Sequence, residues 1–576
     1  MNTSPHTPRQ PSAYMGAPVE IRTGPNGEIA RAELIHHGEQ FTRQVHRVRD
    51  GVFCHVGSCL GNSTLIEGKT GNIIVDTGDC IQQSQEQQED FKKVSDRELS
   101  ALIYTHSHYA LGSRTWVSAE RQGQIPVWGH RDLLKVMSRT VGDLYPFMIQ
   151  RVCMQFGLYL PEHGPDAMPN EGLGPFFFPL SRYTPTGGFV PPNHAIDDGQ
   201  EAEIDGVRFQ FFHTPSDSDD TILIWLPEHR VAINNLAWPV MFNIYTLRGE
   251  MFRNPLALLP GIDRMIALRP EHLVGVHGVP ISGEAAIQQA LTEYRDCIQF
   301  TYDQTVRGIN MGLSPDELVD FVQLPPALAH GRLTGQFYGE LSFYVRQIYC
   351  GLVGWFGNDT VELHPVRKAD EAQRLIDLAG GRERMLAQAQ TALQAREFSW
   401  AAQLATYLVR TDASDAAARQ LKADALRAMG QITTAANTRS WYLTQARALE
   451  GQVDTRKVPV NLVNPQMVRS LPPLAYVNAL RFKLDPALSA HGSKRVRFTL
   501  SVSPEQVLSQ DLVLRHGVVT LEAPVTASGD ASISLNMDEW SQLVGGGKTL
   551  EALLAQGITL EGDQELAMTI LRCAAP

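Results

Sequence analysis

The sequence predicts an α/β fold for the first half of the chain, followed by a helical region and a small α+β domain. Short runs of β-branched and aromatic residues alternate with turn signals and helical stretches over residues 30–288. Apolar residues then recur at spacings of three and four over residues 289–452, and strand patterns return over residues 453–576. Residues 1–29 are rich in Pro, Gly and polar residues, so we expect them to form a loose arm.

Charge and composition exclude two classes of partner. The chain has 576 residues and a net charge of −12, which argues against nucleic acid because phosphate neutralisation needs a basic surface. No run of about eighteen apolar residues occurs, so we expect no membrane span. The N-terminus lacks the apolar run of a secretory signal, and the seven scattered cysteines suit reduced thiols. Together these features predict a cytoplasmic protein.

Several segments of the first region have the composition of buried strands. Two of them, 99–108 and 272–280, deliver a histidine at the end of the strand, and α/β proteins usually place their chemistry at the C-terminal ends of strands. The segment 61–79 is expected to form two strands joined by a Gly turn, with an exposed Asp76-Thr77-Gly78 loop at its end. The segments are 61–79, 99–108, 207–215, 221–227 and 272–280.

The second and third regions carry weaker chemical signals. Residues 384–431 are rich in Ala, Leu and Gln, and Asp412 and Asp415 stand in a short connection where helix caps belong. This pattern predicts a helical hairpin of tetratricopeptide type that acts as a scaffold or dimer interface. The third region has no cluster of titratable residues, so we expect no catalysis there.

The stretch "IYTHSHYALGSRT" at 103–115 raises the question of a metal site. His106 and His108 stand one residue apart after a buried strand, as the first imidazoles of a metal centre do. The positions that follow, Ala110 and Leu111, lack the carboxylate and the imidazole that a two-metal site needs. The motif is therefore open to three interpretations: a working centre, a reduced one or a remnant.

Six motifs follow one another along residues 45–365: "GNIIVDTGD", "YTHSH", "TPSDSDDTILIWLPEHR", "NIYTLRG", "VHGVP" and "YGELSFYVRQIYCGLVGWFGND". On these motifs, residues 45–365 resemble the alkylsulfatase branch of the metallo-β-lactamase fold. Residues 380–450 resemble the helical dimerisation domain of that family, and the tail resembles its sterol-carrier-protein-like domain. The resemblance implies a metallo-β-lactamase αββα sandwich, an all-α dimerisation domain that makes a homodimer, and a small α+β sterol-carrier-like domain. In the tail, the resemblance rests on "LRHGVVTLE" and "ASISLNM".

The resemblance implies one intact set of metal ligands. His106 and His108 match the two spaced histidines of the family motif H-x-H-x-D-H, and Asp217 stands where the family usually has Glu. Asp219 or Asp220 in the same acidic loop is an alternative carboxylate. Two imidazoles and a carboxylate suit Zn²⁺, and the same trio suits Fe(II) with open positions for oxygen and substrate.

The second metal of the family is not expected. Its later histidine is matched by His277 in "VHGVP", but the motif Asp is Ala110 and its final His is Leu111. The bridging acid falls on Asn234 or Asn235. The sequence therefore predicts a single divalent metal, with zinc favoured and Fe(II) as the alternative. Three roles stay open for His277: a further ligand of that metal, a base, or a hydrogen-bonding residue.

At the positions where the family holds the sulfate, this sequence has the family's residue types. At the position that protonates the leaving alcohol, it does not. Asn243 and Arg248 in "FNIYTLRG" match residues that bind the anion, and a guanidinium fork suits an oxyanion. Arg248 could instead be a buried structural arginine. In "YGELSFYVR", Phe343 stands where the family has its acid histidine.

Three functions are consistent with this pattern. The one we carry forward is a metal-dependent hydrolase resembling alkylsulfatases, with His277, Arg248 and Asn243 as catalytic residues and an anionic, aliphatic ester or amphiphile as its substrate. The second is a mononuclear non-haem Fe(II) enzyme that oxidises its substrate on the same scaffold. The third is a catalytically silent dimer that binds an amphiphile, since fold alone does not fix the reaction.

Overall fold

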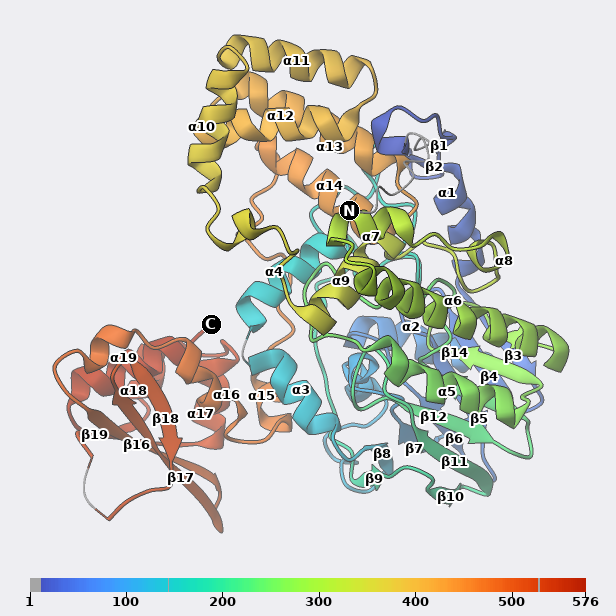
Figure 1. The fold of residues 1–576 in the computed structure, drawn as a ribbon. Coiled ribbons are helices and arrows are strands. Elements are labelled where there is room, and N and C mark those ends of the chain that lie inside the picture. The colour runs from blue at the N-terminus through green and yellow to red at the C-terminus, as the bar shows by residue number, and fades with distance from the viewer. Residues whose placement is uncertain (1–11, 143, 527–528) are drawn as a thin grey trace.

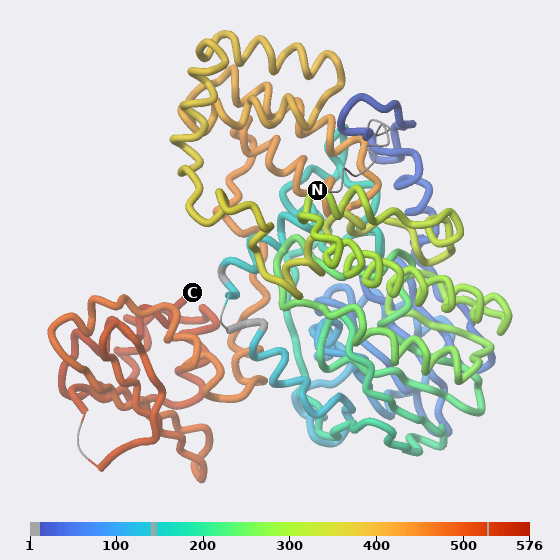
Figure 2. The backbone as a smooth tube through the Cα atoms, in the orientation of Figure 1, coloured from blue at the N-terminus to red at the C-terminus, as the bar shows by residue number. Residues whose placement is uncertain are grey.

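The computed structural model describes residues 12–142, 144–526 and 529–576. The chain folds into a sandwich domain, a helical domain and a C-terminal domain, which are distinct in the ribbon and in the backbone tube (Figures 1 and 2). Helices α3 (Leu133–Gly142) and α4 (Tyr145–Gln155) lie between the sandwich and the C-terminal domain (Figure 1). In the part of the chain that is described, no helix is both long and apolar enough to cross a membrane.

The predicted αββα sandwich is confirmed. Apolar residues of a seven-stranded and a six-stranded sheet, such as Ile66 and Phe209, form the core between the sheets. Helix α2 (Ile81–Phe91) packs its Phe91 on the outer face of the first sheet, while α5 (Pro255–Leu268) and α6 (Glu284–Asn310) cover the second. The first sheet has the order β3 (Gln44–Arg49), β4 (Val52–Val56), β5 (Ser63–Glu67), β6 (Asn72–Val75), β7 (Leu99–Ile103), β8 (Val127–His130) and β9 (His194–Ile196).

The second sheet contains the remaining strands predicted for this region. Its central strand β12 is buried on both faces because the other sheet lies on one side and the helices lie on the other. The parallel pair β13–β14 brings the ends of two distant segments together, as parallel strands do. The order is β10 (Glu201–Ile204), β11 (Val207–His213), β12 (Ile222–Leu226), β13 (Val231–Asn234), β14 (His272–Gly275) and β15 (Ile281–Ser282).

The loop after β6 differs from its prediction. The Asp76-Thr77-Gly78 loop was expected to be exposed, but Asp76 is 1% exposed. Its carboxylate accepts hydrogen bonds from the backbone N–H and the hydroxyl of Thr105, at 2.8 and 2.6 Å. The polar loop is buried because its side chains fix the neighbouring loop that carries His106.

The predicted boundary between the sandwich and the helical region falls inside a helix. Helix α6 begins at Glu284, and Ile287, Leu291 and Tyr294 of its first turns belong to the core beneath the second sheet. The start of the helical region is therefore the outer layer of the sandwich. Helices α7 (Pro315–Phe321), α8 (Pro326–Ala329) and α9 (Leu341–Val353) follow.

The segment predicted as one helical hairpin contains three helices. The helix that begins at Arg382 stops before Arg396, whose φ of +63° lies in the left-handed region. Asp415 caps the third helix, where its carboxylate accepts from the N–H of Ala418 at 3.1 Å. The domain consists of α10 (Lys368–Leu378), α11 (Arg382–Gln394), α12 (Phe398–Thr411), α13 (Ala416–Ile432) and α14 (Ala436–Leu449).

The C-terminal domain is the predicted α+β unit. Its five-stranded sheet packs against helices around the fully buried Trp540. In sheet order its strands are β18 (Val518–Glu522), β17 (Gln506–Arg515), β16 (Lys494–Ser503), β19 (Ala531–Asn536) and β20 (Thr559–Gly562). Its helices are α15 (Pro465–Ser470), α16 (Ala475–Ala479), α17 (Met537–Val544), α18 (Leu550–Leu554) and α19 (Gln564–Ala574).

The N-terminal arm is more ordered than its composition predicts. Residues 1–11 lie outside the described residues, but β1 (Ile21–Thr23) pairs with β2 (Ile29–Arg31). Tyr14 lies edge-on to Tyr442 of α14, with 6.4 Å between ring centroids. Contacts with the helical domain hold this segment, which has little apolar surface of its own.

Candidate metal centre and its cavity

The structure brings together the three side chains predicted as metal ligands. His106 and His108 follow β7, and Asp217 lies in the loop between β11 and β12. The Asp217 carboxylate is 3.1 Å from Nδ1 of His108 and 4.0 Å from Nε2 of His106. All three ligand atoms lie within 4.8 Å of one another, and among the described residues this is the one such group of His, Cys, Asp and Glu.

The orientation of His106 is fixed by the loop beneath it. Its Nδ1 is 2.9 Å from the Thr105 hydroxyl, which itself donates to Asp76. Because the hydroxyl proton is used in that bond, Nδ1–H of His106 donates to Thr105, and Nε2 keeps its lone pair. That lone pair faces Asp217, as a ligand atom must.

Burial and charge set the protonation of the three groups. Burial lowers the pKa of His106 to about 3, so this imidazole is neutral at pH 7. Burial would raise the pKa of Asp217, but the facing imidazoles of His108 and His106 outweigh it and hold that pKa well below its usual range. Burial also opposes the charged form of His108, yet Asp217 raises its pKa.

Asn235, at a position matched to the family's bridging acid, is a donor. Its Nδ2 lies 2.7 Å from Oδ1 of Asp217 and 3.2 Å from Nε2 of His106, and its Oδ1 accepts from the indole of Trp238 at 3.1 Å. The amide thus holds two predicted ligands in place. The sequence did not predict this role, because it showed only that Asn234 or Asn235 replaces the family's bridging carboxylate.

Tyr109 fills the space between the ligand group and His277. Its ring lies edge-on to His106 and His277, with centroid distances of 5.2 and 5.5 Å. Its hydroxyl is 3.4 Å from Nε2 of His277, whose Nδ1–H donates to the carbonyl of Leu60 at 2.8 Å. Only a glycine fits at position 61, because a Cβ there would lie 2.4 Å from the ring of Tyr109.

The predicted alternatives for the carboxylate ligand lie elsewhere. Asp220 is fully buried, but its carboxylate accepts from the hydroxyls of Ser218 and Ser107 and is not part of the ligand group. Asp219 is exposed and paired with Arg139 at 3.0 Å. Of the three acidic residues in the loop, Asp217 alone faces the histidines. His277 is likewise outside the group.

A cavity of about 190 Å³ ends at His108 and Asp217 of the ligand group. Most of its wall is apolar, and the wall comes from the sandwich, from α4 and from the connection into the C-terminal domain. A second cavity of about 300 Å³ shares Tyr145, Ile149 and Val463 with it and reaches Lys483 of the C-terminal domain. The apolar lining of the first cavity, which ends at the candidate ligands, includes Leu60, Leu111, Ile149, Val152, Phe156, Leu173, Phe177, Leu462, Val463 and Met467.

Arg248 is one of the few charged groups in the wall of this cavity. It pairs with Glu250 at 3.0 Å, while its Nε is buried without a hydrogen-bond partner. Burial would lower the pKa of Arg248, but Glu250 raises it, so the guanidinium stays charged. Its Nε is thus a charged donor that faces the cavity without a protein partner.

Asn243 and Phe343 lie outside the cavity wall. Asn243 was predicted to face the anion; its buried Oδ1 lies near Gly339, and its backbone carbonyl accepts from Arg253 at 2.7 Å. Phe343, at the N-terminal end of α9, lines a separate surface pocket with Trp441. The aromatic side chain at the family's acid position therefore points away from the ligand group.

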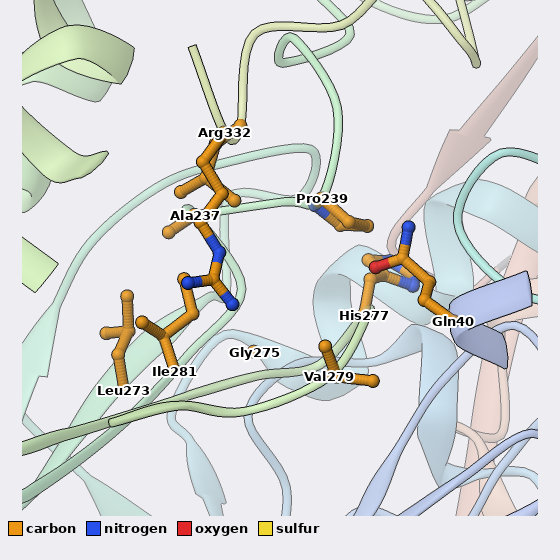
Figure 3. Close-up of a pocket in the computed structure, with 10 residues that line it drawn as sticks. Gln40, Ala237, Pro239, Leu273, Gly275, His277, Val279, Ile281 and Arg332 are labelled. Carbon is orange, nitrogen blue, oxygen red and sulfur yellow. The ribbon is translucent and has the colours of Figure 1, made fainter. Parts of the chain in front are cut away.

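A small hollow lies beside His277 (Figure 3). Its volume is about 50 Å³, and Gln40 and Arg332 line it together with residues of β14 and β15. Neither His106 nor His108 borders it. The hollow is too small for an organic substrate, so the larger cavity is the candidate site.

One acidic residue of the larger cavity was not singled out from the sequence. Asp79 follows the Asp76-Thr77-Gly78 loop, lines the cavity and is 7% exposed. The only signal was its place after a strand end, which many turn residues share.

Comparison with known proteins confirms the resemblance seen in the motifs. Models of three families match the chain: the metallo-β-lactamase superfamily over residues 56–233, alkyl sulfatase dimerisation over 314–452 and the SCP-2 sterol transfer family over 477–573. A solved structure of a stereoselective inverting sec-alkylsulfatase from Pseudomonas sp. shares the fold, with a TM-score of 0.85 at 22% identity. It covers 98% of this chain and 93% of that one.

Two curated relatives define the family more closely. A linear primary-alkylsulfatase from Pseudomonas sp. is 32% identical over 524 residues, which cover 88% of this chain and 98% of the relative. An alkyl/aryl-sulfatase from Saccharomyces cerevisiae is 30% identical over 74% of this chain and 66% of its own length. The chain therefore belongs to the alkylsulfatase family of metallo-β-lactamase-fold hydrolases.

Proposed function

We propose that this protein hydrolyses sulfate esters of aliphatic alcohols with one divalent metal held by His106, His108 and Asp217. The observation that carries the proposal is the shape of the site: an apolar cavity ends at His108 and Asp217, two of these three side chains, and at the Arg248 guanidinium. An alkyl sulfate has the same division, with an apolar chain and an anionic head.

The three side chains fit a divalent metal by their donor chemistry. Two imidazoles, of which His106 is neutral, and an ionised carboxylate are donors that zinc accepts. We assign zinc to the site, with Fe(II) as the alternative that the same trio could hold. When bound, the metal would supply a Lewis acid that polarises the ester and lowers the pKa of water.

Other side chains of the cavity bind and shield the ester. Arg248 offers its unpartnered Nε to a sulfate oxygen, and Glu250 holds the guanidinium in place. His277 and Tyr109 form a neutral hydrogen-bonded pair beside the ligand group, since burial lowers the pKa of His277 to about 4 and raises that of Tyr109. Apolar residues such as Phe177 exclude water, which strengthens each polar contact inside.

The test is release of sulfate and alcohol from dodecyl sulfate. We expect turnover by the purified protein, loss of turnover after a chelator removes the metal, and recovery with about one equivalent of Zn²⁺. Recovery with Fe(II) alone, together with oxygen uptake, would instead favour the oxidative alternative. Binding of dodecyl sulfate without turnover in any metal form would favour the silent amphiphile-binding dimer.

The proposed active unit is a homodimer. The family model for the dimerisation domain covers residues 314–452, and within it a segment after α9 carries large apolar side chains in solvent, with Trp355 68% and Val361 72% exposed. Exposed apolar patches of this kind mark protein interfaces. The other exposed apolar residues here are Leu352 and Val353 at the end of α9 and Leu363 and Val366 in the segment after it.

Charges placed in this segment should separate the subunits. We expect the Trp355→Asp/Val361→Asp variant to fall from twice the chain mass to 63.8 kDa when light scattering measures its molar mass. The matched control is Val518→Asp/Val525→Asp on the exposed face of the C-terminal domain, which should stay dimeric. A monomeric wild-type protein, or a dimer that survives the first pair of substitutions, would contradict the proposal.

A further inference from the structure

Asp79 is a buried acid in the wall of the cavity, in the loop between β6 and α2. It is 7% exposed, and its Oδ2 has no hydrogen-bond partner. Its backbone N–H donates to Oε1 of Gln83 at 3.1 Å, which fixes the loop but leaves the carboxyl unused. A carboxylate buried without a partner carries a large desolvation cost, so this side chain has no structural reason to be an acid.

The surroundings of Asp79 favour the protonated form up to neutral pH. Burial raises the pKa of its carboxyl to about 7, although the charges of His108 and Arg248 act in the opposite direction. The other titratable groups that interact with it are Cys59, Cys80 and Tyr109, and burial raises the pKa of each, so they are neutral. Asp79 is therefore a carboxylic acid that can give up a proton at the pH of the cell.

Asp79 is not one of the candidate metal ligands. The ligand atoms of His106, His108 and Asp217 lie within 4.8 Å of one another, and Asp79 is outside that group. It lines the same cavity, together with Arg248. A substrate whose sulfate sits between the metal ligands and Arg248 thus has a proton donor within the same enclosed space.

The proposed reaction needs such a donor. When water attacks the sulfur of an alkyl sulfate, the bond between sulfur and the bridging oxygen breaks and its electron pair goes to that oxygen. The resulting alkoxide is a strong base and a poor leaving group, so a proton delivered in the transition state speeds the step. Phe343 cannot deliver one.

We propose that Asp79 is the general acid that protonates the departing alcohol, an inference that rests on the proposed function. The carboxyl proton of Asp79 passes to the bridging oxygen as the sulfur–oxygen bond breaks, which gives the alcohol. One proton of the attacking water stays on the product as hydrogen sulfate, and the other restores the Asp79 carboxyl. Atoms and charge then balance for one ester and one water.

The test compares two esters of the same shape in the Asp79→Asn variant. In 2,2-difluorododecyl sulfate the alcohol is more acidic than in dodecyl sulfate and needs less help from an acid. We expect Asp79→Asn to lower kcat for dodecyl sulfate by about 10²–10⁴-fold, and for the difluoro ester by at least about tenfold less. Asn has the shape of Asp, and the thermal midpoint should not fall.

A matched control removes a different buried acid. Glu171 is 2% exposed, its Oε2 lacks a partner, and burial raises its pKa to about 8, but it does not line the cavity. Glu171→Gln should leave the ratio of the two rates unchanged. Infrared difference spectra of wild type minus Asp79→Asn provide a readout that needs no turnover: a carboxylic-acid carbonyl band should be present in acid and fade as the pH rises through about 7.

Two results would overturn the assignment. One is an equal loss of kcat for both esters in Asp79→Asn, which would make Asp79 a structural or binding residue while sulfate release by the wild type still stands. The other is the absence of the carbonyl band below pH 7. If the wild type hydrolyses neither ester, the proposed function fails, and the role of Asp79 in it fails as well.

Discussion

Replacement of His106 and His108 together by Ala is expected to abolish metal binding and hydrolysis of dodecyl sulfate. The two imidazoles supply two of the three candidate ligands, and Asp217 alone cannot hold a divalent ion against water. Because a metal contributes several kcal/mol of transition-state stabilisation, we expect kcat/KM to fall by at least about 10³-fold. Elemental mass spectrometry should show about one equivalent of metal in the wild type and less than about a tenth in the variant.

A matched control removes two imidazoles elsewhere. His130 and His213 stack on one another with ring centroids 4.3 Å apart, and neither lines the cavity. The His130→Ala/His213→Ala variant should keep its metal. Two equivalents in the wild type would mean that other residues, with His277 among the possible ligands, hold a second ion. Equal metal content in the wild type and the His106/His108 variant would refute the ligand assignment.

Arg439→Ala is expected to give the largest loss of stability. This arginine is fully buried, and its guanidinium donates to backbone carbonyls of three separate segments: Ile29 in β2, Gly430 in α13 and Ala167 in the loop after α4, at 2.7–3.0 Å. Burial lowers its pKa to about 10, so it stays charged at pH 7. Its removal leaves a cavity and several unsatisfied carbonyls, which should cost about 3–5 kcal/mol.

Hydrogen exchange read out by mass spectrometry can localise this effect. Amides of residues 29–31 and 166–167 should lose protection in Arg439→Ala, and Arg439→Lys should recover only part of it because a single ammonium cannot reach all these carbonyls. Arg410→Ala, on the exposed face of α12, should change the free energy of unfolding by less than about 0.5 kcal/mol. Unchanged protection at β2 would show that Arg439 does not hold these segments together.

The fold was predictable because its signals are local. Strands such as β7 and β12 are short apolar runs bounded by turn residues, and the helical region keeps its three-and-four spacing over more than a hundred residues. The predictions of secondary structure and order failed where tertiary contacts determine the local structure. A hairpin became three helices at Arg396, whose positive φ has no sequence signature in a non-glycine residue, and the N-terminal segment is ordered by contacts with Arg439 and Tyr442.

The site was predictable only in part because it is assembled from distant loops. The spacing of His106 and His108 identified one loop, and the family pattern pointed to Asp217, which the structure places beside them. Asn243 matched the pattern as well, yet its side chain turns toward Gly339, because sequence position does not determine the direction of a side chain in an irregular loop. Asp79 was missed since its burial arises from packing against residues far along the chain.

The cavity wall has a consequence for how such an enzyme diversifies. Leu462, Val463 and Met467 belong to the connection into the C-terminal domain, whereas the candidate metal ligands belong to the sandwich. One part of the apolar wall is thus encoded in a stretch of the gene that is separate from the stretches of the candidate metal ligands. Recombination or insertion near residues 458–463 can change which chains fit and leave the reacting centre untouched.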